Sequence, residues 1–199
     1  MPGDVKRVIL LHKGLEFLSN RVIPQANTNH LPRISGGFQS IKQDQPSTRL
    51  QAADRSGKRL LDALLRDTEM QQCVVFAATK RSTEELCGLL AGSGFSVAAL
   101  HGDMQQGQRT RTLQRLRDGH TQVLVATDVA ARGIDVAGIS HVINFDAPRQ
   151  AEDYVHRIGR TGRAGRSGVA VTLMGHHEKH RVLDIERYTG QPIRVDVIP

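Results

Sequence analysis

The sequence predicts an α/β protein in which a parallel β-sheet is covered by helices on both faces. Two observations predict this. Short apolar stretches alternate with amphipathic ones from residue 56 onward, and the apolar stretches are apolar throughout rather than at every second position. A strand that is apolar at every position is buried on both faces, which is typical of parallel sheets. In such folds, ligands bind at the carboxyl ends of the strands.

Each element follows from its own pattern. Leucines at positions 60, 61, 64 and 65 have helical spacing and predict a first helix over 58–66. The apolar run CVVFAA at 73–78 predicts a buried strand, and Gly92 and Gly94 end the helix that follows it. The same reasoning predicts further strands at 96–100, 122–126, 141–145 and 168–174, with helices at 82–90, 105–117, 150–158 and 178–188.

Residues 1–55 have a different composition from the rest. Pro24, Pro32 and Pro46 interrupt the segment, and Asn, Gln and Ser are frequent between them. This composition predicts an irregular N-terminal segment or linker, with a short helix around 8–18, before a single domain over 56–199. Whether residues 1–45 are ordered stays open.

Composition limits the classes of function. The 27 Lys and Arg residues against 20 Asp and Glu give a net charge of +7, which favours a polyanionic partner such as nucleic acid. No apolar stretch approaches the roughly 20 residues of a membrane span, and residues 8–11 are too short for a secretory signal, so a cytoplasmic location is expected. Cys73 and Cys87 are expected to be buried, reduced thiols.

The most informative segment is YVHRIGRTGRAGRSG, residues 154–168. Arginines recur at every third position from 157 to 166, and glycines recur in step with them from 159 to 168. A solvated basic loop is one interpretation, whereas a collagen-like repeat without proline and a flexible tail between a helix and a strand are both poor ones. The favoured interpretation is a fixed loop that aims guanidinium groups at phosphates, because arginine stays charged and bonds phosphate oxygens with two parallel donors.

Several motifs resemble those of DEAD-box RNA helicases of superfamily 2, in their C-terminal, RecA-like domain and in the bacterial form of the family. HRIGRTGR at 156–163 resembles motif VI, FAAT at 76–79 motif IV, and VATDVAARGID at 125–135 motif V. HGDM at 101–104 and QGQR at 106–109 resemble the Q-x-x-R region, and HVINFDAP at 141–148 the strand and turn after motif V. The motifs occur in the family's order over about residues 55–174, which makes the set far more specific than any one of them.

The resemblance implies roles in ATP use. Arg160 and Arg163 correspond to arginine fingers that reach the ATP γ-phosphate across an interdomain cleft, and such fingers accelerate related hydrolases by ~10³–10⁵. His156 corresponds to a residue that links this loop to catalytic carboxylates of the other domain. Asp135, with Gly133 beside it, corresponds to the contact for the ATP ribose. For Arg157, a salt bridge that holds the loop is the structural alternative.

The resemblance also implies an RNA-binding side. The residues concerned are Thr79, Gln106, Arg109, Thr127 and Arg132. Hydroxyl, amide and guanidinium groups bond phosphates and 2′-hydroxyls without reading bases. Because aromatic residues make up only 4% of the chain, base stacking and strong sequence preference are not expected.

Other parts of a helicase are not found in this sequence. It contains neither G-x-x-x-x-G-K-[ST] nor a D-E-A-D quartet, so the ATP phosphates and Mg²⁺ are expected to be held mainly by a first RecA-like domain, in cis or in trans. No metal site is expected here, since histidines 176, 177 and 180 lack a completing carboxylate or cysteine. Two hypotheses remain: half of an RNA-dependent ATPase and helicase that is inactive alone, or a stand-alone RNA-binding or regulatory module.

Overall fold

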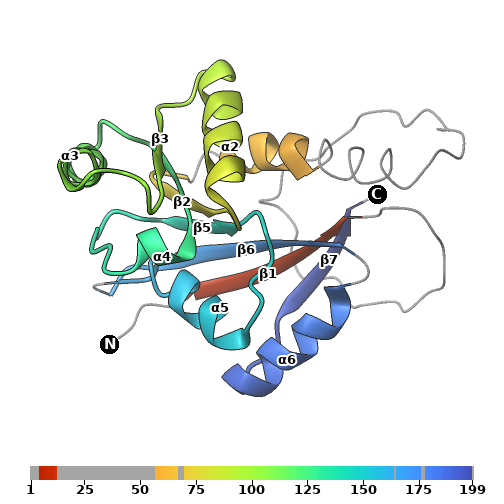
Figure 1. Cartoon of the computed structure of the whole chain (residues 1–199). Helices are drawn as coiled ribbons and strands as arrows, with labels where there is room; N and C mark the ends of the chain where they lie inside the picture. The colour runs from red at the N-terminus through yellow and green to blue at the C-terminus, as the bar shows by residue number, and fades with distance from the viewer. Residues whose placement is uncertain (1–4, 13–56, 67–69, 164, 176–177, 199) are drawn as a thin grey trace, which may run out of the picture.

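The computed structural model describes residues 5–12, 57–66, 70–163, 165–175 and 178–198, and its architecture is an α/β sandwich (Figure 1). An opening helix spans residues 57–65. The other elements are β1 (Val5–His12), β2 (Cys73–Phe76), α2 (Lys80–Gly92), β3 (Val97–Leu100), α3 (Gln106–Arg117), β4 (Val123–Ala126), α4 (Asp128–Ala131), β5 (His141–Asn144), α5 (Ala151–Ile158), β6 (Gly168–Gly175), α6 (Lys179–Thr189) and β7 (Arg194–Ile198).

The strands form one parallel sheet in the order β3-β4-β2-β5-β6-β1-β7. Cys73 of β2 lies opposite Val123 of β4 on one side and His141 of β5 on the other. All five strands and all five helices predicted from residue 56 onward are present, with ends that differ by a few residues. The predicted fold class is therefore confirmed.

Three elements were not predicted. Residues 8–12 lie in strand β1, which pairs with β6 and β7, so the expected helix is wrong there, and residues 13–18 lie outside the described part. A four-residue apolar run fits either a helix or a strand, and its pairing with two distant strands decides the outcome. Strand β7 alternates polar Arg194 and Asp196 with valines, a period-two pattern that could have revealed it, and α4 is a single short turn.

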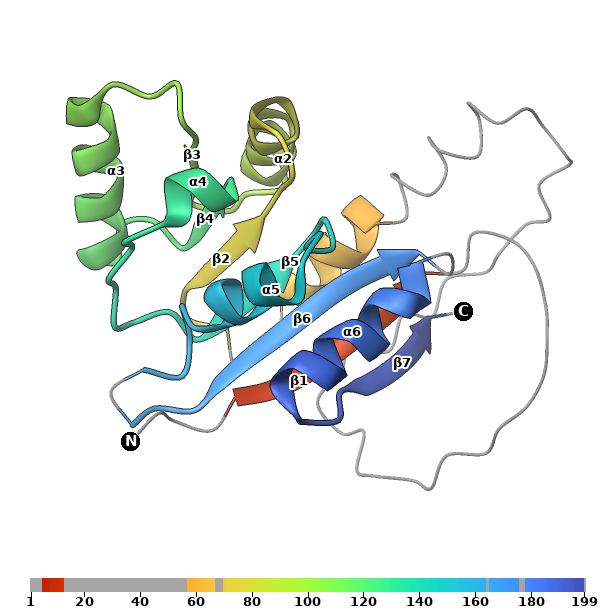
Figure 2. The ribbon, with the colours of Figure 1, turned by 60° about the horizontal axis from the view of Figure 1, so that its bottom comes forward.

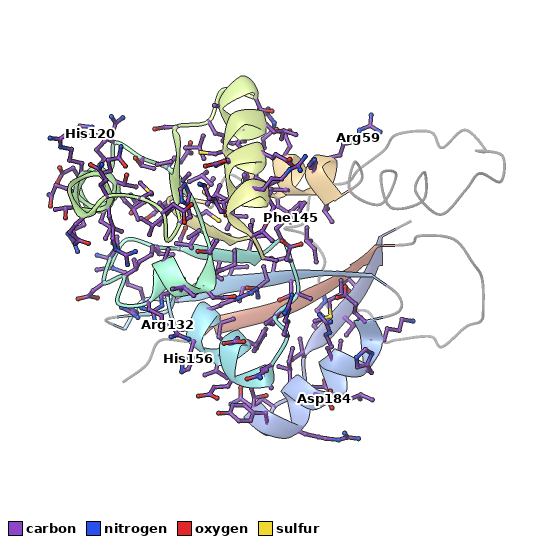
Figure 3. All side chains as sticks on the ribbon, in the orientation of Figure 1. Arg59, His120, Arg132, Phe145, His156 and Asp184 are labelled. Carbon is purple, nitrogen blue, oxygen red and sulfur yellow. The ribbon has the colours of Figure 1, made fainter. Side chains whose placement is uncertain are left out.

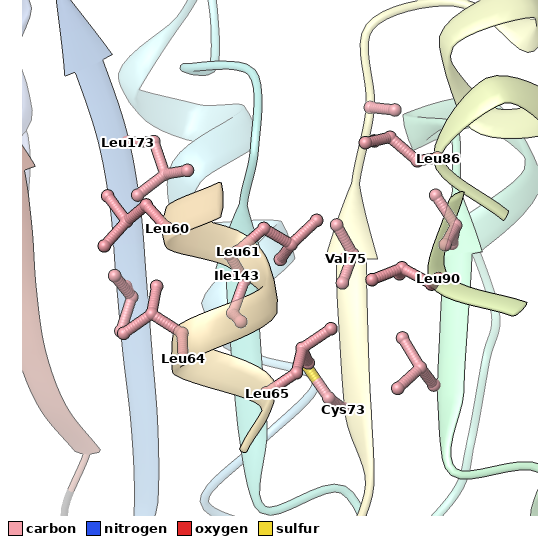
Figure 4. Close-up of a cluster of buried hydrophobic side chains, with 14 of the residues drawn as sticks. Leu60, Leu61, Leu64, Leu65, Cys73, Val75, Leu86, Leu90, Ile143 and Leu173 are labelled. Carbon is pink, nitrogen blue, oxygen red and sulfur yellow. The ribbon is translucent and has the colours of Figure 1, made fainter. Parts of the chain in front are cut away.

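Side chains of the central strands point alternately to two covered faces. Cys73 and Val75 of β2 pack in a cluster with leucines of the helix at 57–65 and of α2 (Figure 4). Val74 and Phe76 pack instead with residues of α3 and α4 on the opposite face. A third cluster of buried side chains joins α5 and α6 to β6. Figure 2 shows the ribbons of these two helices beside that strand. The prediction that helices cover both faces is confirmed for this part of the sheet.

Both cysteines are free thiols, as expected, although Cys87 is only partly buried. Burial raises the pKa of each thiol above its ordinary value, which favours the unreactive neutral form. Among the helices that the structure describes, none is long and apolar enough to pass through a membrane.

Leu61→Ala should destabilise the fold strongly. Leu61 has no solvent-exposed surface and lies in the cluster under the opening helix, so its truncation leaves a cavity and should lower the free energy of unfolding by about 2–5 kcal/mol. Leu183→Ala on α6, where the side chain is 54% exposed, is the matched control and should change stability by less than about 1 kcal/mol. Urea unfolding followed by circular dichroism measures both, and equal losses would contradict the assignment of the core.

Candidate functional site

Arg157 is the buried residue around which the site is assembled. Its side chain is 4% exposed, and its Nε and Nη2 donate to the two carboxylate oxygens of Asp128 at 2.6 and 2.7 Å. Its Nη1 donates to the carbonyl of Asp146 at 2.7 Å and to Asn144 Oδ1 at 3.3 Å. The guanidinium also lies over the Phe76 ring, 5.1 Å from its centre. One side chain of α5 thus binds α4 and the ends of β2 and β5 together.

The loop after α5 is fixed by close packing. The hydroxyl of Thr161 is buried between the carbonyl oxygens of Ile139 and Ser140, at 2.7 and 2.9 Å. A Cβ on Gly168 would contact the Thr161 side chain and lie 2.7 Å from the amide nitrogen of Gly162. Because glycine has no Cβ, Gly168 allows the start of β6 to lie this close to the loop.

Arg160 and Arg163 meet at the carbonyl group of Ile134, and Asp135 pairs with Arg163. Arg160 Nη1 donates to the Ile134 oxygen at 2.9 Å and Arg163 Nη1 donates to it at 3.3 Å. Arg163 Nη1 also lies 2.9 Å from Asp135 Oδ1 in an ion pair whose carboxylate is 87% exposed. Burial and the nearby charge of Arg163 lower the pKa of Arg160 below its ordinary value, although a guanidinium stays charged at physiological pH. Two positive groups and one carboxylate are thus held side by side at the surface.

An open pocket lies next to this group. Its volume is about 240 Å³, which is smaller than the ~300–1,000 Å³ of ordinary small-molecule sites, so this open wall of side chains does not enclose a small molecule by itself. Gly133 in this wall has a φ of 75°, a conformation that side chains other than glycine rarely adopt. The pocket is lined by Phe76, Asp128, Ala131, Arg132, Gly133, Asp153, His156, Arg157 and Arg160.

The residues expected to contact RNA lie at or beside the carboxyl ends of neighbouring strands. Thr79 follows β2 and Thr127 follows β4, and these strands pair in parallel, so the two threonines share one edge of the sheet. Thr79 also caps α2, since its hydroxyl oxygen accepts a hydrogen bond from the Ser82 amide at 3.1 Å. Gln106 begins α3, and the Arg109 guanidinium donates to the carbonyl of Ala130, which ties α3 to α4.

Three of the residues predicted to act on ATP, namely Gly133, His156 and Arg160, line the pocket, and one residue predicted to contact RNA lies there with them. Arg132 was assigned to the RNA side but lines the pocket with His156 and Arg160, and Figure 3 labels Arg132 and His156 on adjacent elements. Thr79 and Thr127 lie after the carboxyl ends of strands, where a parallel sheet is expected to place its ligands. Arg160 and Arg163, by contrast, lie in a loop that precedes strand β6.

Several residues that build the site were not identified from the sequence, namely Asp128, Asn144, Thr161 and Gly168. Asp128 lies inside the motif at 125–135, but its partner Arg157 is 29 residues away and only the fold brings them together. Within the described residues, no group of three or more His, Cys, Asp or Glu side chains is placed to hold a metal ion.

Gly168→Ala should destabilise the loop that carries Arg160 and Arg163. The added methyl group collides with backbone, so the free energy of unfolding should fall by about 1–3 kcal/mol. Gly88→Ala, in the middle of α2 with no atom within 4 Å of the new Cβ, should instead stabilise the chain by up to about 1 kcal/mol. Urea titration of the two variants tests this, and a stabilising effect at position 168 would refute the close approach.

Comparisons with known proteins all indicate the same protein family. The model of the helicase conserved C-terminal domain matches residues 56–165. The ATP-dependent RNA helicase DeaD of Mycobacterium tuberculosis is 51% identical over 144 residues, which cover 71% of this chain and 26% of that protein. The chain spans about a quarter to a third of the length of the curated relatives it matches.

Solved structures agree with this assignment. The Escherichia coli DEAD-box protein SrmB, in a crystal structure with the regulator of ribonuclease activity A, superposes with a TM-score of 0.68 and 43% identity, covering 72% of this chain and 85% of that one. Dbp5 of Saccharomyces cerevisiae, bound to RNA and ADP BeF3, gives a TM-score of 0.66 and 36% identity over 73% of this chain and 39% of that one. This chain belongs to the DEAD-box RNA helicase family and contains its C-terminal, RecA-like helicase domain.

Proposed function

We propose that this chain is one half of an RNA-dependent ATPase that unwinds RNA duplexes or remodels RNA–protein complexes. In this proposal Arg160 and Arg163 act on the γ-phosphate of ATP, and Asp135 and Gly133 contact its ribose. A first RecA-like domain, in cis or in trans, holds the other phosphates and Mg²⁺. The chain by itself does not hydrolyse ATP.

The observation that carries the proposal is that Arg160 and Arg163 bond one carbonyl group, with Asp135 paired to Arg163, beside an open pocket. Two adjacent guanidinium groups repel each other unless an anion lies near, and among the described residues Asp135 is the carboxylate that forms an ion pair with them. A polyphosphate would supply the remaining negative charge. It would also accept paired hydrogen bonds from each planar guanidinium group.

His156 supports the same assignment. It lies in the last turn of α5 and lines the pocket, one residue before the buried Arg157. Because Arg157 is fixed on four groups, the position of His156 on the helix is fixed too. In the proposed enzyme His156 joins this wall to carboxylates of the first domain and so acts as a positioning residue.

RNA binding is proposed for the edge formed by Thr79, Gln106, Arg109 and Thr127, with Arg132 between this edge and the pocket. The side chains there offer hydroxyl, amide and guanidinium groups, which suit backbone phosphates and 2′-hydroxyls. The relative Dbp5 has been solved with RNA and ADP BeF3 bound, which supports RNA as the ligand class for this chain.

Arg163→Ala should abolish ATP hydrolysis in a reconstituted enzyme while leaving RNA binding nearly intact. The reconstituted enzyme is this chain joined to a competent first RecA-like domain, and RNA-stimulated ATPase should fall by about 10³-fold or more because the transition-state charge loses its partner. Arg166→Ala is the matched control, since Arg166 is exposed in the same loop and its removal should leave the rate within about twofold.

Three outcomes separate the alternatives. ATPase activity in this chain alone would overturn its description as a half-enzyme. Failure of any competent first domain to restore activity, with RNA binding retained, would favour a stand-alone RNA-binding or regulatory module. Equal loss of ATPase and RNA binding in Arg163→Ala would refute the assignment of this arginine to ATP.

A further inference from the structure

The ion pair between Arg163 and Asp135 joins two groups that the proposed function assigns to opposite ends of ATP. Arg163 Nη1 lies 2.9 Å from Asp135 Oδ1, and the two residues are 28 positions apart in the sequence. In the proposed function Arg163 acts on the γ-phosphate and Asp135 contacts the ribose. Because the α- and β-phosphates lie between these two parts of ATP, two side-chain groups that bond each other cannot bond both parts at once. The pair therefore has to open before ATP can bind as proposed.

Asp135 contributes an exposed carboxylate to this pair. Its side chain is 87% exposed, whereas that of Arg163 is 32% exposed. Exposed ion pairs typically shift an equilibrium by up to about fivefold. A polyphosphate is a stronger partner for the guanidinium group, because it carries more charge and offers paired acceptor oxygens. The pair is therefore weak enough for ATP to open, yet strong enough to lower the affinity of ligands that compensate only one of its partners.

Asp135 also distinguishes the two arginines of the loop from each other. Arg163 Nε donates to the carbonyl oxygen of Gly159 at 2.7 Å, so its side chain lies along the loop. Arg160 makes the corresponding contact, since its Nε donates at 3.2 Å to the carbonyl oxygen of His156, which is labelled in Figure 3. Of the two arginines, Arg163 is the one whose charge is paired with Asp135. The carboxylate therefore competes with a ligand phosphate for Arg163 in particular.

The effect of this competition depends on the chemistry of the ligand. An inorganic polyphosphate can bond Arg163, but it leaves Asp135 without a partner and places a second anion beside it, which like charges oppose. A nucleoside diphosphate offers ribose hydroxyls to Asp135 but no γ-phosphate to Arg163. A ribonucleoside triphosphate supplies a new partner to each side chain. Opening of the pair is thus fully compensated only when both ends of the ligand are present.

We propose that the Arg163–Asp135 ion pair is a specificity determinant, which favours ribonucleoside triphosphates over ligands that carry only the polyphosphate or only the ribose end. This inference rests on the proposed function, because it takes the same two contacts and adds that they exclude each other before the ligand binds. Asp135 acts twice in this account. It holds Arg163 while the site is empty, and it contacts the ribose once the γ-phosphate has taken its place.

The test compares tripolyphosphate with ATP on the full chain. Titration followed by amide chemical shifts measures the dissociation constants of both ligands for the parent, Asp135→Asn, Arg163→Ala and the double variant. Asp135→Asn should bind tripolyphosphate about two- to fivefold more tightly than the parent, but ATP no more tightly, because the ribose contact is weakened. In the Arg163→Ala background the same change should bring no gain. Asp184→Asn removes the same charge from an exposed pair with Arg187 on α6 and, as the control, should bind both ligands as the parent does.

Each other outcome has a distinct meaning. If Asp135→Asn binds tripolyphosphate no more tightly than the parent, or gains as much in the Arg163→Ala background or in the α6 control, the inference is wrong and the proposed function stands. An equal gain for ATP and tripolyphosphate in Asp135→Asn overturns the inference together with the ribose contact. Parent-like binding of both ligands by Arg163→Ala overturns it together with the assignment of Arg163 to the γ-phosphate.

Discussion

The bidentate pair between Arg157 and Asp128 is the interaction on which the arrangement of the site depends. It joins two segments that are adjacent in space but 29 residues apart in sequence. Because Arg157 is almost fully buried, losing Asp128 would leave the guanidinium charge in a poorly hydrated setting, which makes the geometry costly to change. The same guanidinium reaches Asn144 and Asp146, so the end of α5 cannot shift without breaking several hydrogen bonds at once.

From this fixed helix end the chain turns directly into the loop that carries the surface arginines. The buried hydroxyl of Thr161 donates a hydrogen bond to the backbone and holds the loop in place. The absence of a side chain at Gly168 lets the loop pack closely against β6. Arg160 and Arg163 consequently project over Ile134 and Asp135 with little freedom of the backbone. Rigid placement of charge is what makes such groups effective in stabilising a transition state, since no reorganisation is needed when charge develops. The same few contacts therefore stabilise the domain and hold in place the side chains of its proposed chemistry.

Much of this fold could be predicted from local pattern, and the limits of the prediction have physical causes. The strands β2, β3 and β4 are apolar at every position, which indicates burial on both faces, and these strands, together with β5 and β6, were predicted to within a few residues. Strand β1 was missed because its partners β6 and β7 lie more than 150 residues away and its apolar run is short. In the site, arginines 157, 160 and 163 recur with one spacing, and a salt bridge that holds the loop was the structural alternative for Arg157 alone. The first lies in the last turn of α5 and faces inward, whereas the other two follow the helix end, and their contacts with residues 134 and 135 arise only in the folded chain.

The central claim is that Arg157 holds the loop of Arg160 and Arg163 in place, and amide hydrogen exchange tests it most directly. The amides of Gly159, Arg160 and Thr161 are hydrogen bonded to carbonyl groups of α5, so their exchange reports how often the loop opens. In Arg157→Lys, which keeps the charge but cannot form the bidentate pair, these amides should exchange at least about tenfold faster, while amides of α2 keep the parent's rates. Unchanged exchange at Gly159, Arg160 and Thr161 in that variant would contradict the account.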